Sequence, residues 1–266
     1  MTDFEGLTFE RNGGVATITF NRPERLNAIR WPMIEGITHY AKEVAADDSV
    51  RVLVITGNGR AFSSGDDIVN GMGDRPEHYG PPAGMSRNLG PHHNMTKTLM
   101  SLPKPVVAAI NGRCHGAGWV TALSSDFRIA RDDVLIGDIR SGKAIFAGQA
   151  VPLLLPRLIG QSRAMDLLVT GRVIDAAEAE RYGLLNRVWP AHRWEQERDA
   201  FIEELANGPT KTYAAWKLTV NRSVLSELDD YTDYEQRLAQ IARDTEDARE
   251  GNLSFKEKRS PVFKGR

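Results

Sequence analysis

Apolar and polar residues alternate along residues 15–20, and this run is rich in β-branched side chains, which predicts a strand. Residues 50–57 are apolar almost without interruption and are followed by Asn58 and Gly59. Such a run is typical of a strand buried on both faces. Apolar residues recur with helical spacing over 32–46, between the two strands. The chain therefore opens with a strand, a helix and a central strand.

A second strand-and-helix unit begins with the apolar run 107–110, which breaks into a turn of small residues at 116–118 and reopens as a helix. Two short strands are predicted after it, over 126–130 and 134–137. Beyond residue 148 the pattern is mainly helical, with helices expected around 153–155, 165–169, 176–182 and 194–206 and stops at Gly160, Gly171, Gly183 and Gly208. The last helix is expected to run from about 213 towards 249, with an interruption near Leu228.

This pattern predicts the α/β class, since strands dominate the first half and helices the second. The chain has 266 residues, enough for one large domain or one domain with a helical appendage. Strand-plus-helix units recur loosely at a spacing of about 40 residues, without a clean sequence repeat.

Charge, cysteine content and apolar runs argue against nucleic-acid binding, an internal disulfide and a membrane span. There are 34 basic and 35 acidic residues, so the chain lacks the basic excess of a nucleic-acid-binding protein. The single cysteine, Cys114, excludes an internal disulfide and follows an apolar strand. The first residues do not read as a signal peptide, and no window approaches the ~18 apolar residues of a membrane span. We expect a soluble, cytoplasmic protein that contacts neither membrane nor nucleic acid.

Residues 69–91 are predicted to form a long mobile loop. They contain five glycines and four prolines, far more than an ordered element carries. A structureless stretch of this length is typical of a functional loop or a disordered one. Its position between two candidate sites favours a lid over a pocket.

The turn at 116–118 is a candidate anion site. Small side chains let a ligand approach the main chain, and the N–H groups at a helix start lack partners within the helix. Such donors suit the negative charge that develops on the oxygen of a polarised carbonyl. A tight turn with glycines for packing is the alternative. A similar turn at 59–68 follows the strongest strand, so two amides could point at one oxygen.

Five stretches in this order resemble the crotonase superfamily, also called the enoyl-CoA hydratase/isomerase family; they are residues 21–28, 61–67, 105–126, 155–160 and 257–263. The resemblance implies a spiral of ββα units that forms two sheets, over residues 1–200. It also implies a C-terminal helical region over 201–266 that makes homo-trimers, which pair into hexamers. The resemblance to the family extends over nearly the whole chain.

The resemblance implies an acyl-CoA thioester as substrate, with coenzyme A as part of the substrate and no permanently bound cofactor. In this family the main-chain amides that correspond to Asp66 and Ala117 form the oxyanion hole. Losing one such donor typically costs about 10²–10³ in rate. The resemblance also implies a coenzyme A site along Ser64 and Ile68, with Arg25 near a phosphate. Phe255 and Lys258 match positions that reach the coenzyme A of a neighbouring subunit.

The chain departs from the family at the two glutamates with which its hydratases add water. Val120 and Arg140 occupy the aligned positions. Valine exchanges no proton and arginine stays protonated, so neither can act as a general acid or base. Asp138 is the candidate replacement, because residues 138 and 140 share a face if the backbone is extended there. Asp138 and Arg140 could equally form a structural ion pair, and Arg140 could instead bind a substrate carboxylate.

Asp66 is a second candidate, since its carboxylate could cap a helix or act as a base. His115 is either a proton carrier or a core residue, and His92 and His93 lack a third ligand at metal-site spacing, so no metal is predicted. The reaction stays open between isomerisation, hydrolysis, decarboxylation and an atypical hydration. The alternative is a non-catalytic protein that binds coenzyme A esters or serves as a scaffold.

Overall fold

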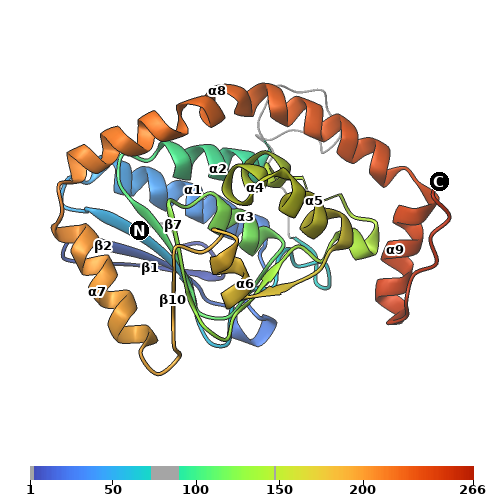
Figure 1. Cartoon of the computed structure of the whole chain (residues 1–266), viewed down its shortest axis with the longest axis horizontal. Helices are drawn as coiled ribbons and strands as arrows, with labels where there is room; N and C mark the ends of the chain where they lie inside the picture. The colour runs from blue at the N-terminus through green and yellow to red at the C-terminus, as the bar shows by residue number, and fades with distance from the viewer. Residues whose placement is uncertain (1–2, 73–89, 147) are drawn as a thin grey trace.

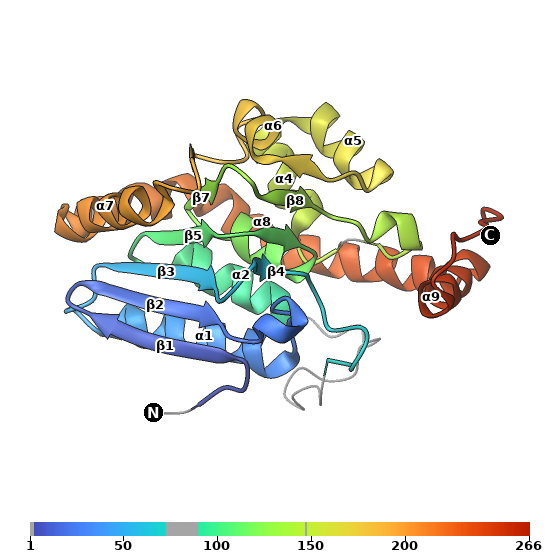
Figure 2. The ribbon, with the colours of Figure 1, turned by 90° about the horizontal axis from the view of Figure 1, so that it is seen from below.

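The computed structural model describes residues 3–72, 90–146 and 148–266, so most of the loop predicted over 69–91 lies outside the described residues. Within these residues the fold has two β-sheets and an outer layer of helices (Figures 1 and 2). No helix in the described part of the chain is both long and apolar enough to cross a membrane. The α/β class predicted from the sequence is confirmed.

The larger sheet has six strands in the order β1, β2, β3, β5, β7, β10. The β1–β2 pair is antiparallel, and every other pair in this sheet is parallel. Its strands are β1 (Leu7–Asn12), β2 (Val15–Phe20), β3 (Val52–Gly57), β5 (Val106–Ile110), β7 (Phe127–Arg131) and β10 (Arg187–Trp189).

The position of the central strand β3 explains why its sequence is apolar throughout. Val52 and Val54 pack in a cluster with Trp194 of helix α7 (Trp194–Asn207), whereas Leu53 and Ile55 belong to the main core on the opposite face. Because successive side chains of a strand point to opposite faces, a strand covered on both faces must be apolar throughout. The prediction of a central strand is confirmed.

The smaller sheet brings the candidate site together. Its strands, in the order β4, β6, β8, β9, are β4 (Ala61–Ser63), β6 (Arg113–His115), β8 (Leu135–Gly137) and β9 (Ile174–Asp175). The first three run parallel, with Ser63 paired to Cys114 and His115 paired to Gly137. Their carboxyl ends therefore meet at one edge, and the turns that follow them lie side by side.

The helices cover both sheets, and α8 extends along the outside of the molecule before the chain turns into α9 (Figure 1). They are α1 (Trp31–Ala46), α2 (Pro91–Ser101), α3 (Ala117–Leu123), α4 (Val151–Ile159), α5 (Gln161–Thr170), α6 (Ala176–Arg181), α7 (Trp194–Asn207), α8 (Thr210–Arg243) and α9 (Glu246–Glu257). The division predicted after residue 200 lies within α7 and stays a prediction.

The interruption predicted near Leu228 is wrong. Leu228 is fully buried within α8, which continues for 34 residues. The chain breaks instead at Asp244 and Thr245, where the Thr245 side chain accepts a hydrogen bond from the N–H of Ala248 and so caps α9. A threonine cap starts a new helix at this point, and the apolar spacing alone does not reveal it.

Glu250 fixes the C-terminal segment to α9. Its carboxylate accepts hydrogen bonds from Arg259 and from the N–H of Val262, and these contacts lower the pKa of Glu250 to about 2. A carboxyl group with a lowered pKa in the folded state stabilises that state above its ordinary pKa of 4.5 and loses this effect as the pH falls towards 2. We expect E250Q to lose less stability than the native chain across this range, as measured by urea unfolding; equal losses would contradict the assignment.

Candidate active site

Two glycine turns touch at the edge of the smaller sheet. Gly65 follows β4 with φ +99°, and Gly116 follows β6 with φ +52°, a region that L residues rarely adopt. A Cβ on Gly116 would lie 3.0 Å from the Cα of Gly65, and one on Gly65 would lie 3.2 Å from the Cα of Gly116. Only glycine at both positions allows the two backbones to approach so closely.

This contact brings together the main-chain amides that follow the glycines, those of Asp66 and Ala117. Neither N–H has a hydrogen-bond acceptor among the described residues. Ala117 begins α3, as predicted from the sequence. Two main-chain amides without acceptors therefore lie on turns that touch, and their assignment to an oxyanion hole stays a prediction.

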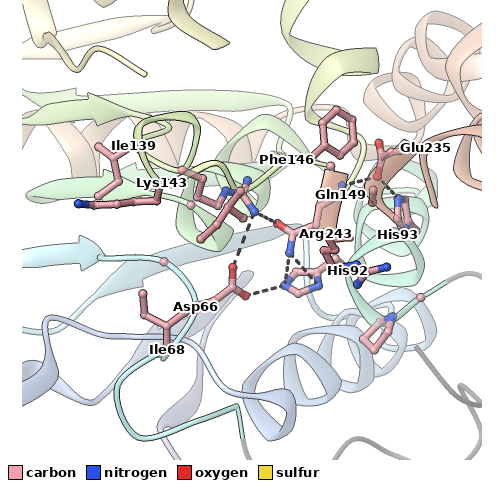
Figure 3. A pocket seen from close by; sticks show the side chains of 18 of the residues that line it. Asp66, Ile68, His92, His93, Ile139, Lys143, Phe146, Gln149, Glu235 and Arg243 are labelled. Atoms are coloured by element: carbon pink, nitrogen blue, oxygen red, sulfur yellow. Dashed lines mark hydrogen bonds and ion pairs between the residues drawn. The ribbon is translucent and has the colours of Figure 1, made fainter. Parts of the chain in front are cut away.

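A cavity of about 370 Å³ opens beside these turns, and Figure 3 shows the side chains that line it. Its apolar wall includes Trp31, Ile139, Ile145, Phe146 and Phe255. Its polar lining includes Asp66, His92, His93, Arg140, Lys143, Gln149, Glu235 and Arg243. Asp66 and Gly116 both line it, so the amide donors lie beside the space in which a ligand would bind.

The Asp66 side chain lies between a histidine and an arginine. His92 Nε2 is 3.2 Å from Oδ1 of Asp66, and Arg140 Nη1 is 3.8 Å from Oδ2 (Figure 3). Burial raises the pKa of this carboxyl, but the contact with His92 and the charge of Arg140 outweigh burial and leave the pKa of Asp66 below its ordinary value. Asp66 is therefore ionised at neutral pH.

Within the described residues, Oδ1 of Asp66 is buried without a hydrogen bond. His92 Nε2 approaches this oxygen as an ion-pair partner at 3.2 Å. The sequence left two roles open for Asp66, a helix cap and a base. The structure does not support the cap, because the carboxylate contacts the side chains of His92 and Arg140. An ionised carboxylate with an unused acceptor in a cavity is able to accept a proton.

Asp138 is held away from the cavity. Arg140 Nε donates to its Oδ1 at 2.8 Å and Nη2 to its Oδ2 at 2.6 Å, and the Asp138 side chain is 1% exposed. The condition for a shared face, an extended backbone across 136–140, is not met, because β8 ends at Gly137 and Arg140 has helical torsion angles before the short helix Ser141–Lys143. The two side chains still meet, as the bidentate ion pair that the sequence left as an alternative.

Arg140 has little capacity left for a substrate carboxylate. Besides Asp138, its Nη1 donates to Oε1 of Gln149 at 2.8 Å and faces Asp66. Val120, which the resemblance aligns with the other glutamate of the hydratases, is completely buried in α3. His115 hydrogen-bonds through Nδ1 to the carbonyl of Gly137 at 3.2 Å, and burial lowers its pKa. It does not line the cavity, so the core reading fits its position.

Three of the five residues assigned to coenzyme A line the cavity: Ser64, Ile68 and Phe255. Arg25 is exposed beside them, and its carbonyl accepts a hydrogen bond from Ser64 Oγ at 3.5 Å. Lys258 is exposed at the end of α9. Phe255 reaches the cavity of its own chain, with Lys143 Nζ 6.0 Å from its ring centroid. The predicted reach of Phe255 and Lys258 to a second subunit stays a prediction.

Two lining residues, Gln149 and Glu235, were not singled out from the sequence. Gln149 precedes α4 and Glu235 lies in α8, 86 positions further along the chain, and neither belongs to a local motif. Of the described residues, no three His, Cys, Asp or Glu side chains are grouped to hold a metal ion. The expectation of a metal-free protein stays a prediction.

Comparison with known proteins identifies the family of the chain. A sequence profile described as enoyl-CoA hydratase/isomerase matches residues 10–266. The chain is 35% identical to a probable enoyl-CoA hydratase of Mycobacterium bovis, with 98% of each chain covered. It is also 35% identical to the 1,2-epoxyphenylacetyl-CoA isomerase of Escherichia coli, with 95% of this chain and 96% of that protein covered.

Solved structures give the same result. The fold matches that of an enoyl-CoA hydratase from Mycobacterium avium subsp. paratuberculosis with a TM-score of 0.86 and 29% identity, covering 98% of this chain and all of the other. A carnitinyl-CoA hydratase from Mycobacterium avium matches with a TM-score of 0.84 and 26% identity, covering 98% and 99% of the two chains. The chain has the crotonase fold and belongs to the enoyl-CoA hydratase/isomerase family.

Proposed function

We propose that this protein is an acyl-CoA isomerase, which moves a double bond along the acyl chain through a thioester enolate and uses Asp66 as its proton carrier. Membership of the family supports an acyl-CoA thioester as the substrate. The observation that carries the proposal is the ionised carboxylate of Asp66, which lines the cavity. The main-chain amide of the same residue lies beside the Gly116 turn.

The reaction begins at the carbon between the thioester and the double bond. Asp66 removes a proton from this carbon, and the electrons move onto the thioester oxygen. The amides of Asp66 and Ala117 donate hydrogen bonds to the resulting enolate oxygen, and such donors act where charge develops. The protonated Asp66 then returns its proton to the γ carbon, which shifts the double bond into conjugation.

Isomerisation is favoured over hydration because it requires one proton carrier. Hydration of a double bond requires one group to activate water and another to protonate the carbon, and the two glutamate positions of the family's hydratases hold Val120 and Arg140. Two relatives whose names state an isomerase support this reading: the Escherichia coli protein above and the trans-2-decenoyl-[acyl-carrier-protein] isomerase of Streptococcus mutans, at 33% identity over 99% of this chain.

Deuterium exchange tests the proposed function without a variant. We expect a panel of β,γ-unsaturated acyl-CoA esters in D₂O to give the α,β-unsaturated isomers with deuterium at the α or γ carbon. No hydroxyacyl-CoA should form. A hydroxyacyl or hydrolysed product would show a different reaction, and binding of the panel without exchange would show the non-catalytic alternative. Boiled protein is the control for spontaneous exchange.

A further inference from the structure

A carboxylate of the long outer helix reaches the active-site cavity. Glu235 of α8 is 3% exposed and lines the cavity (Figure 3). Its Oε1 accepts a hydrogen bond from the N–H of Gln149, and its Oε2 accepts one from the N–H of Ala150 at 2.9 Å. His93 Nε2 lies 2.8 Å from the same Oε1. One side chain of α8 thus holds two consecutive amides of a turn that lies more than eighty positions away in the sequence.

The turn that Glu235 holds is in an unfavourable conformation. Gln149 and Ala150 have φ of +68° and +66°, and neither is a glycine. A left-handed backbone is strained for residues other than glycine and persists only where the surroundings impose it. Gly148 permits the approach, since a Cβ there would lie 2.7 Å from Oε1 of Glu235. Two hydrogen bonds to a charged acceptor are strong enough to hold the turn.

This conformation directs the Gln149 side chain to the residues around Asp66. Its Oε1 accepts a hydrogen bond from Arg140, and its Nε2 lies 3.2 Å from Nε2 and 3.3 Å from Nδ1 of the His92 ring. His92 and Arg140, together with Gln149 itself, lower the pKa of Asp66. A continuous series of contacts therefore joins Glu235 to Asp66 through the Gln149 turn (Figure 3).

We propose that Glu235 is a positioning residue for the proton carrier: by fixing the Gln149 turn it sets the positions of His92 and Arg140 around Asp66. This inference rests on the proposed function, because it assigns Glu235 to the reaction that Asp66 carries out. Glu235 touches no reacting atom in this role. The competing view is that Glu235 only docks α8 onto the body of the protein through His93.

The test compares E235Q with E227Q. Glu227 is a carboxylate of the same helix that pairs with Arg157 at 2.8 Å on the surface, so E227Q is a matched control. We expect E235Q to lower kcat for a β,γ-unsaturated acyl-CoA about 10- to 100-fold, the usual effect of losing a supporting contact behind a reactive group. KM should stay within about threefold, and E227Q should match the native protein. A loss of thermal stability with unchanged kcat would overturn the proposal.

Two further variants test whether Glu235 acts on Asp66 through Gln149. Q149A should lower kcat by a similar factor, and the double variant E235Q/Q149A should be no slower than the slower single variant within about threefold, because both act on one series of contacts. Independent, multiplying losses would overturn the proposal. If E235Q does not fold, G148A replaces it, because a methyl group there displaces the Glu235 carboxylate while leaving it in the chain; full activity of folded G148A would count against the role.

A spectroscopic measurement separates this proposal from the proposed function. We expect the imidazole ¹⁵N signals of His92, read by NMR at one pH without substrate, to move in E235Q and in Q149A and to stay in place in E227Q. These shifts would support the positioning role even if the native protein isomerised no ester in the panel. An unmoved His92 signal in both E235Q and Q149A would overturn it, whatever the reaction.

Discussion

The D66N variant is expected to lose about 10²–10⁴-fold in kcat for acyl-CoA isomerisation, the usual contribution of a positioned acid or base. Asparagine keeps the size and the main-chain amide of Asp66, so the proposed oxyanion donor stays in place. It cannot take a proton from carbon at any ordinary pH. Binding of free coenzyme A should change little, because this ligand lacks the acyl group. Steady-state kinetics and calorimetric titration measure the two effects.

The neighbouring aspartates provide matched controls for D66N. Asp67 is 3% exposed and receives a hydrogen bond from Arg22 at 2.9 Å, and Asp138 is paired with Arg140. D67N should reduce stability while keeping kcat within a fewfold of the native value. D138N leaves Arg140 without its charge partner and should reduce stability more strongly. If D66N kept full activity on a confirmed substrate, the assignment of Asp66 as the proton carrier would fail.

The pH dependence of kcat/KM follows from the same residue. A carboxyl group with a lowered pKa is deprotonated above that pKa, so the base form is present across neutral pH and is lost only in acid. We therefore expect a rate that is flat through neutral pH and falls on the acid side. A rate that rose with pH only above neutrality would show that Asp66 is not the base.

The sequence predicted the fold best where burial is two-sided or where a turn has strict geometry. The continuous apolar run of β3 and the small-residue turn before α3 are found as predicted. Strand β1 was missed because its exposed end carries Glu10, Arg11 and Asn12, which hide the alternation of the strand. Helix α2 was missed because polar residues occupy buried positions in it, among them His92, His93 and Thr96.

Some residues of the candidate site could be predicted from local sequence, and others could not. Asp66 and Ala117 each follow a strand and a glycine, so local sequence was enough to expect their amides at one place. Asp138 and Arg140 are close in sequence, and their pairing could be stated as an alternative even though the backbone between them was predicted wrongly. Gln149 and Glu235 meet only because α8 folds back across the cavity. No local pattern marks a contact between such distant positions.

The contact between the two glycine turns leads to the second large effect. In G116A, the added Cβ would lie 3.0 Å from the Cα of Gly65, a tighter contact than most Cβ atoms make, and alanine would also strain the φ of +52°. The turns must separate by a few tenths of an ångström, which moves the amides of Asp66 and Ala117 apart. We expect kcat to fall about 10²–10³-fold, the effect of losing one oxyanion donor. Stopped-flow or steady-state kinetics with a β,γ-unsaturated acyl-CoA measures this loss of kcat.

The control for G116A is G13A, since Gly13 also has a positive φ but lacks the steric contact. Gly13 has φ +54°, and no atom lies within 4 Å of where its Cβ would be. G13A should lose about 1 kcal/mol of stability from conformational strain alone, while its kcat stays native. Native kcat in folded G116A would mean that these amides do not hold the enolate oxygen. A large loss in G116A alone ties the rate to the spacing of the two turns.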